Sequence, residues 1–271
     1  MRFKIPVIVF LVLAVLPLAA GLGYAFLYSI GLTGAVSKGF TVLHWQVVLT
    51  DPNVWGALAL SLGMAVLVLV MSAVLALCTA LMLRKPLEGR WAFLPYLPLT
   101  MPPLVAAFWV FQLLSRGGWL SRLLGFERPE AFPELVNDAS HVGVLLALVM
   151  LTFPFLTLLF LAQARAAGLP ALMQAAQTLG ASSRQAVWRV AVPVLLFRTR
   201  PALLLYGLFL VGAYEVPLLL GRQSPRMLSV LIAQKFRRFD LLELPQAYVL
   251  TCLYAAFVVL MVLFNKKSVI Q

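Results

Sequence analysis

The chain lacks the sequence motifs on which most enzyme assignments rest. It contains no Gly-Lys pair, so a GxxxxGK[ST] phosphate-binding loop is excluded and ATP hydrolysis cannot be assigned to it. HExxH, CxxC, GxSxG and GxGxxG are also missing. The nine acids and the two isolated histidines, His44 and His141, form no acid–base, nucleophilic or metal-ligating constellation. We therefore expect no enzymatic activity, no metal site and no cofactor on this chain.

Charged side chains are also scarce, and this scarcity defines the fold class. Charged residues make up 11% of the chain and hydrophobic residues 63%, against about 25% and about 45–50% in ordinary globular domains. So little polar surface excludes a soluble protein. Six apolar runs approach the roughly 20 residues that cross a bilayer as a helix: 6–29, 57–83, 93–114, 142–164, 202–221 and 247–264. The prediction is an all-α, polytopic membrane protein with six transmembrane helices, organised in the lipid bilayer as a single domain over residues 1–271.

The net charge of +12 is divided unevenly between the two sets of loops that these runs define. One set holds twelve basic residues and a single acid, Glu88. The positive-inside rule places this set, which includes both termini and residues 165–201, in the cytoplasm. Membrane topology thus accounts for the basicity without a nucleic-acid partner. It predicts a multi-pass protein of the cell inner membrane with both termini cytoplasmic.

A stretch of the 165–201 segment has the pattern of a folded cytoplasmic element. Pro170 suits a first helical position, and Gly180 suits the residue just past a helix end. Between them, four apolar residues fall at i, i+3, i+4 and i+7 and form one stripe of a short helix: Leu172, Ala175, Ala176 and Leu179. The spacing therefore predicts a short helix that ends in a glycine corner.

A second helix is predicted directly after this corner. Ser182 precedes Gln185 by three residues, which is the spacing of a capping box. Pro193 is expected to end the helix, because proline cannot continue it. A helix, a corner and a helix in a membrane-bound chain are most simply a docking surface for a soluble partner. The alternative is a helix pair on the inner membrane surface that binds no partner.

Prolines interrupt the third apolar run. Pro95, Pro98, Pro102 and Pro103 remove backbone donors, so we expect a kinked or broken helix. In lipid, the freed carbonyl groups need partners, which favours burial against other helices or along a watered cavity. Pro102 and Pro103 are therefore candidates for a substrate pathway. A kink that only helps the helices to pack is the alternative.

The fifth run carries a carboxylate. Glu215 lies between Tyr214 and Pro217 in the sequence GAYEVPLLLG. An acid within an apolar run is costly and is a candidate functional residue, so Tyr214 and Glu215 join the pathway candidates. Glu215 could equally cap a backbone break at Pro217. A pathway carboxylate would suit a cation, whereas an ion-coupled secondary transporter would use Glu215 as part of an ion relay.

The spacing of one motif resembles a known family. Gln174-Ala175-Ala176, Gly180 after three further residues, and the ending Val190-Ala191-Val192-Pro193 resemble the EAA loop of ABC-importer permeases, the inner-membrane components of binding-protein-dependent transport systems with the MetI-like fold. The six-run layout, the prolines of the third run and GAYEVPLLLG also look like the branch that handles polyamines, ferric iron, thiamine or oxyanions.

The resemblance implies a permease subunit that couples to an ATPase. In such permeases the loop seats in a cleft of a cytoplasmic ABC ATPase dimer, which carries ATP and Mg, and a second permease subunit, a paralogue or a copy, completes the pathway. A periplasmic or lipid-anchored binding protein delivers the solute, for which Glu215 favours a polyamine. The family usually has Glu where this chain has Gln174, so a full ion pair with the ATPase is lost. The coupling residues implied are Gln174, Ala175, Ala176, Leu179, Gly180, Ala181 and Pro193.

Overall fold

The computed structural model describes residues 4–34, 37, 39–83, 94–238, 240–241 and 243–269, and all regular structure in these residues is helical. The all-α prediction is confirmed. The chain divides into two compact units, Met1–Leu58 with Leu228–Phe264, and Ala59–Met227 with Asn265–Gln271. The single domain over residues 1–271 stays a prediction.

The first unit is built from long apolar helices and two short ones. Its elements are α1 (Lys4–Phe10), the π-helical η1 (Leu11–Val15), α2 (Leu16–Ser29), α3 (Leu43–Thr50), the start of α4 (Pro52–Leu83), α12 (Leu228–Arg237) and most of α13 (Leu244–Val269). Its core consists of Val48, Val54, Leu228, Val249 and Leu250. Tyr28 of α2 lies against Tyr248 of α13, with ring centroids 4.3 Å apart. Apolar and aromatic contacts therefore hold this unit together.

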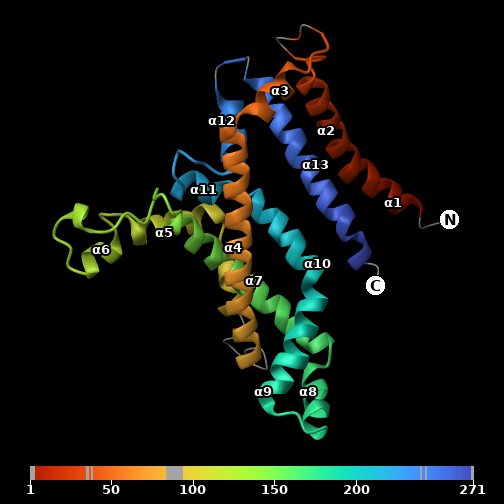
Figure 1. Cartoon of the computed structure of the whole chain (residues 1–271), viewed down its shortest axis with the longest axis vertical. Helices are drawn as coiled ribbons and strands as arrows, with labels where there is room; N and C mark the ends of the chain where they lie inside the picture. The colour runs from red at the N-terminus through yellow and green to blue at the C-terminus, as the bar shows by residue number, and fades with distance from the viewer. Residues whose placement is uncertain are drawn as a thin grey trace. The chain divides into compact units, whose positions relative to one another are not determined.

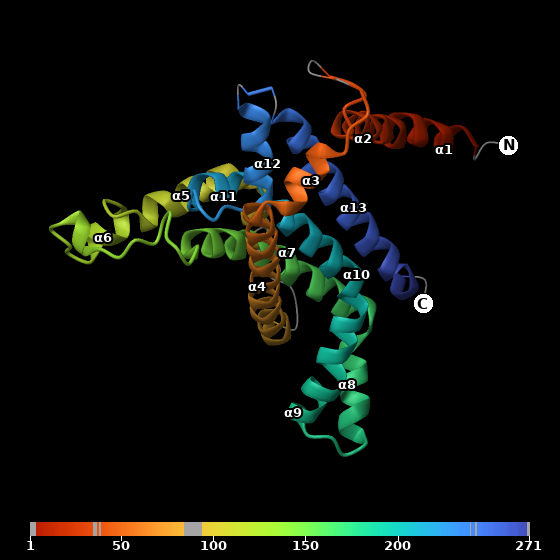
Figure 2. The same cartoon turned by 45° about the horizontal axis from the view of Figure 1, so that its top comes forward.

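The second unit contains the segments that the sequence marks as functional. It comprises the rest of α4, the 3-10 helix η3 (Leu94–Thr100), α5 (Pro103–Leu114), α6 (Trp119–Leu123), η4 (Pro129–Ala131), α7 (Val142–Ala166), α8 (Leu169–Thr178), α9 (Ser183–Ala186), the π-helical η5 (Val187–Ala191), α10 (Val192–Val211) and α11 (Glu215–Leu220). In Figure 1 and Figure 2, α8 and α9 lie side by side and α10 leads away from them.

The core of the second unit joins α4, α7, α8 and α10. Ala76 and Ala80 of α4 are small enough for close helix approach, and they pack against the fully buried Leu156 and Phe160 of α7. Leu169 of α8 belongs to the same cluster, as does Leu195 of α10. The start of α8 is thus anchored in the hydrophobic core of the second unit.

Five helices among the described residues are long and apolar enough to cross a membrane: Val7–Ser29, Pro52–Leu83, Val142–Ala166, Ser183–Val211 and Leu244–Phe264. The count of six is not confirmed. The third predicted span is broken as its prolines predict, into η3 and α5, with Pro102 in an extended conformation between them (ψ 142). Residue 93, where this span was predicted to begin, lies outside the described residues, as does the inner loop that contains Glu88.

The predicted bounds of the fifth span, 202–221, are wrong. The helix begins upstream, because α9, η5 and α10 run on from Ser183 to Val211 without a break. It then ends at Gly212, and α11 is a separate short helix. Much of the predicted 165–201 loop is therefore part of a long helix. A Gly-Ala-Tyr step follows the helix inside the apolar run, so composition alone placed the end of the helix too late.

Candidate functional site

The first helix of the candidate coupling element is α8, and one face of it is anchored. Gly168 precedes it with a positive φ of 60°, and Pro170 lies in its first turn as predicted. Leu169 is buried in the core of the second unit, and Met173, one turn later, packs against the same cluster. The adjoining face carries the predicted apolar stripe, of which Leu172 and Ala175 are exposed. The helix is held from one side and is open on the other.

The corner after α8 has the hydrogen bonds of a Schellman motif. The Gly180 N–H donates to the Gln177 carbonyl at 2.9 Å, and the Ala181 N–H donates to the Ala176 carbonyl at 3.0 Å. Gly180 has a φ of +92°, a region that glycine enters without the strain of a Cβ. The predicted glycine corner is confirmed. Leu179, directly before it, is 89% exposed, which is unusual for a leucine in an ordered turn.

The second helix begins with the predicted capping box. The Ser182 N–H donates to Gln185 Oε1 at 2.9 Å, and the Gln185 N–H donates to Ser182 Oγ at 3.3 Å. Gln177 Nε2 also donates to Ser183 Oγ at 3.2 Å, which connects α8 to α9. Local hydrogen bonds pair backbone groups at the end of α8 and at the start of α9. The corner can therefore keep its shape without a partner.

The prediction that Pro193 ends the second helix is wrong. The chain passes through the π-helical turn Val187–Ala191, in which the Val192 N–H donates to the Val187 carbonyl five residues back. Pro193 then lies in the first turn of α10. A proline clashes with a regular helix because its ring meets the carbonyl four residues back. The wider π turn changes this hydrogen-bond register, so the helix continues through Pro193.

The structure brings most of the predicted coupling residues onto one small surface. Gln174, Ala175, Leu179 and Gly180 are exposed, and Ala176 and Ala181 are half-buried. All six lie on α8 and its corner. Pro193 is exposed but belongs to α10, one π turn beyond α9. The surface of α8 and its corner, Gln174 to Ala181, is called the corner surface below.

The predicted pathway residues lie at two helix breaks. Pro102 precedes α5, with Pro103 as the first residue of that helix. Tyr214 precedes α11, with Glu215 as its first residue. The helices α5 and α11 pack against each other and against α7, and the Asn137 N–H donates to the Leu220 carbonyl at 2.9 Å. The structure therefore places the two broken helices side by side, with Pro102, Pro103 and Glu215 exposed.

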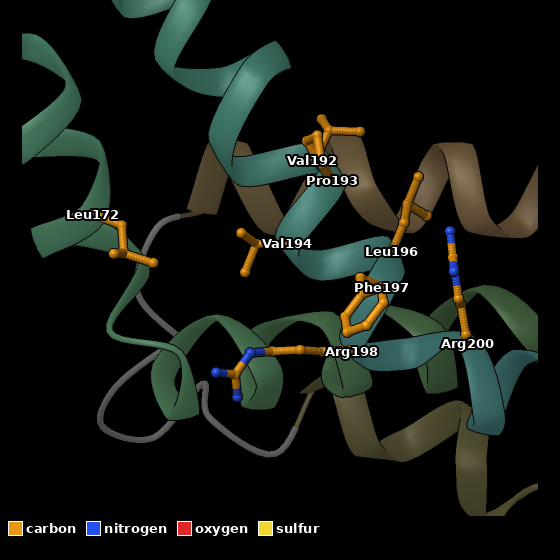
Figure 3. Close-up of a pocket in the computed structure, with 8 residues that line it drawn as sticks. All are labelled: Leu172, Val192, Pro193, Val194, Leu196, Phe197, Arg198 and Arg200. Carbon is orange, nitrogen blue, oxygen red and sulfur yellow. The ribbon is translucent and has the colours of Figure 1, made fainter. Parts of the chain in front are cut away.

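A pocket that the sequence did not predict lies between α8 and α10 (Figure 3). Its volume is about 940 Å³, and it is lined by Leu172, Val192, Pro193, Val194, Leu196, Phe197, Arg198 and Arg200. In the sequence, Arg198 and Arg200 contribute only to the positive charge of the inner loops. The signal that could have indicated a pocket was the position of both arginines on one helix beside apolar residues. Within the described residues, no group of three or more His, Cys, Asp or Glu side chains could hold a metal.

Comparisons with known proteins agree with this architecture. No protein-family model matches the chain. It is 31% identical over 166 residues to the sulfate transport system permease protein CysW of Synechocystis sp., and the match covers 60% of this chain and 56% of that protein. It is 29% identical over 200 residues to the trehalose transport system permease protein SugA of Mycobacterium tuberculosis, and the match covers 69% of this chain and 61% of that protein. The chain thus matches less than two thirds of the length of these relatives.

A solved structure extends the likeness to nearly the whole chain. A chain from the crystal structure of a bacterial ABC transporter that imports the acidic polysaccharide alginate superposes with a TM-score of 0.72 at 18% identity, over 98% of this chain and 93% of that one. The chain is similar to ABC-importer permeases. At this identity the structural match establishes the fold. A related structure holds the alginate transporter in complex with an alginate-bound periplasmic protein.

The likeness to ABC-importer permeases confirms some expectations and corrects one. The relatives are named as permease proteins of transport systems, which agrees with a membrane transport protein that is no enzyme. Their names concern sulfate and trehalose. The polyamine, ferric-iron and thiamine part of the branch expected from the sequence is therefore not supported, whereas its oxyanion part agrees with a relative named for sulfate. The preference for a polyamine depended on the single carboxylate of Glu215, which is exposed at the start of a short helix.

Proposed function

We propose that the chain is the membrane-spanning permease subunit of an ATP-driven importer, and that the corner surface couples it to a cytoplasmic ABC ATPase. The observation that carries this proposal is the corner itself, a preformed Schellman turn and capping box that display an 89% exposed leucine. A surface leucine that is held in place without intramolecular burial is suited to a partner. Burying one leucine side chain is worth about 1.5–3 kcal/mol.

The residues around Leu179 fit close approach by a protein. Ala175, Ala176, Gly180 and Ala181 have small side chains or none, so a partner's surface can reach the backbone of the corner. Gln174 offers an amide that donates and accepts hydrogen bonds. Residues 139–214 contain five arginines and no acid. The partner's face is accordingly expected to be apolar at its centre and acidic around it.

The translocation pathway is assigned to the two broken helices. Interrupted helices inside transporters place free backbone groups next to a substrate, and the breaks before α5 and α11 provide such groups in helices that pack together. Closure of the ATPase dimer on ATP and Mg would move the corner and reorient these helices. A second permease subunit, a copy or a paralogue, would complete the pathway, and a periplasmic or lipid-anchored binding protein would deliver the solute.

For the substrate, we infer an oxyanion such as sulfate or a carbohydrate, following the names of the relatives. Glu215 is not needed for binding either of these. Glu215 is the first residue of α11. Its carboxylate therefore lies at the N-terminal end of this helix, where unpaired N–H groups and the helix dipole favour negative charge. This placement supports the structural alternative for Glu215. An ion-coupled secondary transporter would need an intramembrane ion relay, and a carboxylate with this structural role does not supply one.

The test is transport by the reconstituted complex. The chain is placed in proteoliposomes with its ATPase, its second permease subunit and its binding protein, and uptake of labelled sulfate and of a labelled disaccharide is measured. We expect uptake that requires ATP inside and persists when ionophores collapse the ion gradients. Uptake that follows an ion gradient without ATP would overturn the proposal in favour of a secondary transporter.

A pair of variants tests the coupling surface within this assay. Leu179→Ser removes the apolar contact, and we expect about a tenfold or greater loss of ATPase affinity. Trp119→Ser is the matched control, because Trp119 is also a large exposed apolar residue, at 60% exposure, but lies on α6. Equal ATPase affinity in both variants would contradict the assignment of the corner surface.

A further inference from the structure

The pocket between α8 and α10 combines an apolar lining with two cationic groups. Six of its residues are apolar, and Arg198 and Arg200 supply the charges. Figure 3 shows Arg198 extending from α10 toward the side where Leu172 of α8 lies, with Phe197 between the two arginines. Phe197 is 60% exposed and Leu196 38% exposed, so the apolar surface is open to a ligand.

With the topology that the positive-inside rule predicts, the length of α10 places this pocket near the inner leaflet. The span Ser183–Val211 has 29 residues, which is about 43 Å of helix at 1.5 Å per residue and exceeds a hydrocarbon core of about 30 Å. If the last 20 residues of the span fill the hydrocarbon core of the bilayer, this hydrocarbon core begins at Val192, the first residue of α10 that lines the pocket. If the hydrocarbon core also includes α11, Arg198 and Arg200 lie at its cytoplasmic edge. In both cases long arginine side chains reach the inner headgroup layer.

Among the residues that the structure describes, no acidic side chain neutralises these arginines. Residues 139–214 contain no aspartate or glutamate, and no ion pair to Arg198 or Arg200 occurs among the residues that the structure describes. The Arg200 guanidinium lies 5.2 Å from the centroid of the Phe197 ring. This contact holds the cation at the rim of the apolar lining. Cations next to a membrane require an anionic partner or water.

We propose that this pocket binds an anionic phospholipid of the inner leaflet. The headgroup phosphate accepts hydrogen bonds from Arg198, Arg200 adds positive charge at the rim beside Phe197, and an acyl chain lies against Val194, Leu196 and Phe197. A basic pocket at the cytoplasmic side of membrane helices has the chemistry that anionic headgroups require. The inference goes beyond the proposed function and does not depend on whether ATP drives transport.

A phospholipid fits this pocket better than the ATPase does. Arg198 lies fifteen residues along a continuous helix from Ser183, the first residue after the corner, which corresponds to about 22 Å. A soluble subunit seated on the corner surface is therefore separated from the arginines by most of that length. The apolar lining also matches an acyl chain, whereas a free phosphate ion would use only the arginines.

The test measures lipid binding to the purified full chain. The chain is placed in nanodiscs of phosphatidylcholine that contain phosphatidylglycerol as the minor lipid, and lipids that remain bound on transfer to detergent are counted by native mass spectrometry. We expect retained phosphatidylglycerol in preference to phosphatidylcholine. Arg198→Gln or Arg200→Gln should weaken phosphatidylglycerol binding about fivefold, and the double variant about thirtyfold.

Two further variants separate the pocket from general charge effects. Arg184→Gln with Arg189→Gln removes the same charge from exposed positions outside the pocket, and should leave retention unchanged. Leu172→Trp keeps both arginines but narrows the pocket on the α8 side, and should weaken phosphatidylglycerol retention. Thermal unfolding confirms that each variant is folded.

Three results would overturn the proposal. The first is equal retention of phosphatidylglycerol by the unchanged chain and by Arg198→Gln with Arg200→Gln. The second is equal retention of phosphatidylcholine and phosphatidylglycerol by the unchanged chain. The third is release of the bound lipid when purified ATPase or a second permease subunit is added, which would identify the pocket as a protein-docking site. A failure of ATP-driven uptake would concern only the proposed function.

Discussion

Two glycines that flank α8 provide a matched pair for testing the corner surface. Gly168 has a φ of +60° and Gly180 a φ of +92°, and a Cβ built on either meets no atom within 4 Å. An alanine at either position therefore meets no steric obstacle inside the chain. It bears only the strain of a left-handed conformation, about 1–2 kcal/mol. Effects on folding should thus be similar at the two positions, and any difference between them reports on a partner.

Replacing Gly180 by asparagine separates an effect on partner binding from an effect on folding. Asparagine tolerates left-handed backbone conformations, so Gly180→Asn adds a side chain to the corner surface with little strain. If the ATPase approaches the backbone there, the added atoms overpack the interface. Overpacking costs about 1–3 kcal/mol, which is about a 5- to 150-fold loss of affinity. Gly168→Asn adds the same side chain at the other end of α8, away from the corner surface.

The assay is titration of the detergent-solubilised chain with purified ATPase, followed by uptake in proteoliposomes. We expect Gly180→Asn to weaken ATPase binding and to lower uptake, and Gly168→Asn to leave both close to the level of the unchanged chain. Thermal unfolding should be similar for the two variants. The reasoning is refuted if Gly180→Asn binds ATPase and transports as well as Gly168→Asn does.

Three other predictions concern separate parts of the chain. Ser182→Ala removes the side chain that caps α9 and should cost about 0.5–2 kcal/mol of local stability; hydrogen exchange should quicken at the start of α9, and unchanged exchange would contradict the capping box. Glu215→Gln should retain ATP-driven uptake, whereas loss of uptake in a variant that still binds the ATPase would restore Glu215 as a residue of the substrate pathway. Burial lowers the pKa of His44 below 6.5. The unfolded chain therefore binds a proton at a higher pH than the folded chain does. The free energy of unfolding should fall as the pH drops through 6.5 toward the pKa of the folded chain. His44→Gln should flatten this dependence in thermal unfolding measured from about pH 7.5 to about pH 5, and an equally steep dependence in the variant would refute it.

The features that could be predicted from the sequence depend on local chemistry. The corner needs a glycine at a positive φ, and the capping box needs a serine three residues before a glutamine. The roles of Gly180, Ser182 and Gln185 could therefore be predicted without tertiary information. The break in the third run was readable for the same reason, because Pro102 cannot donate a backbone hydrogen bond. The strong apolar composition marked the membrane helices directly.

The features that escaped prediction depend on register or on packing. Proline rules assume a regular helix, and nothing in Val187–Ala191 marks a π turn, so the continuation through Pro193 could not be foreseen. The pocket could not be predicted from the sequence, because Leu172 and Arg198 line the same pocket only when α8 folds back beside η5. The preference for a polyamine is not supported because it gave the lone acid Glu215 a chemical role that its position at a helix start does not require.

The prolines of the chain differ in their effect on the helices, and the contrast bears on coupling. Pro17 and Pro193 each follow a π-helical turn and lie in the first turn of a helix that continues, whereas Pro102 separates two helices. Because Pro193 leaves the helix intact, one continuous helix runs from Ser183 at the corner to Val211, shortly before the break at Glu215. Pro201 lies inside this helix, where a proline removes a backbone hydrogen bond and allows a bend. A displacement of the corner by a closing ATPase would therefore pass along this helix toward the α11 break, and Pro201 and the interruptions at α5 and α11 are points where the second unit can bend.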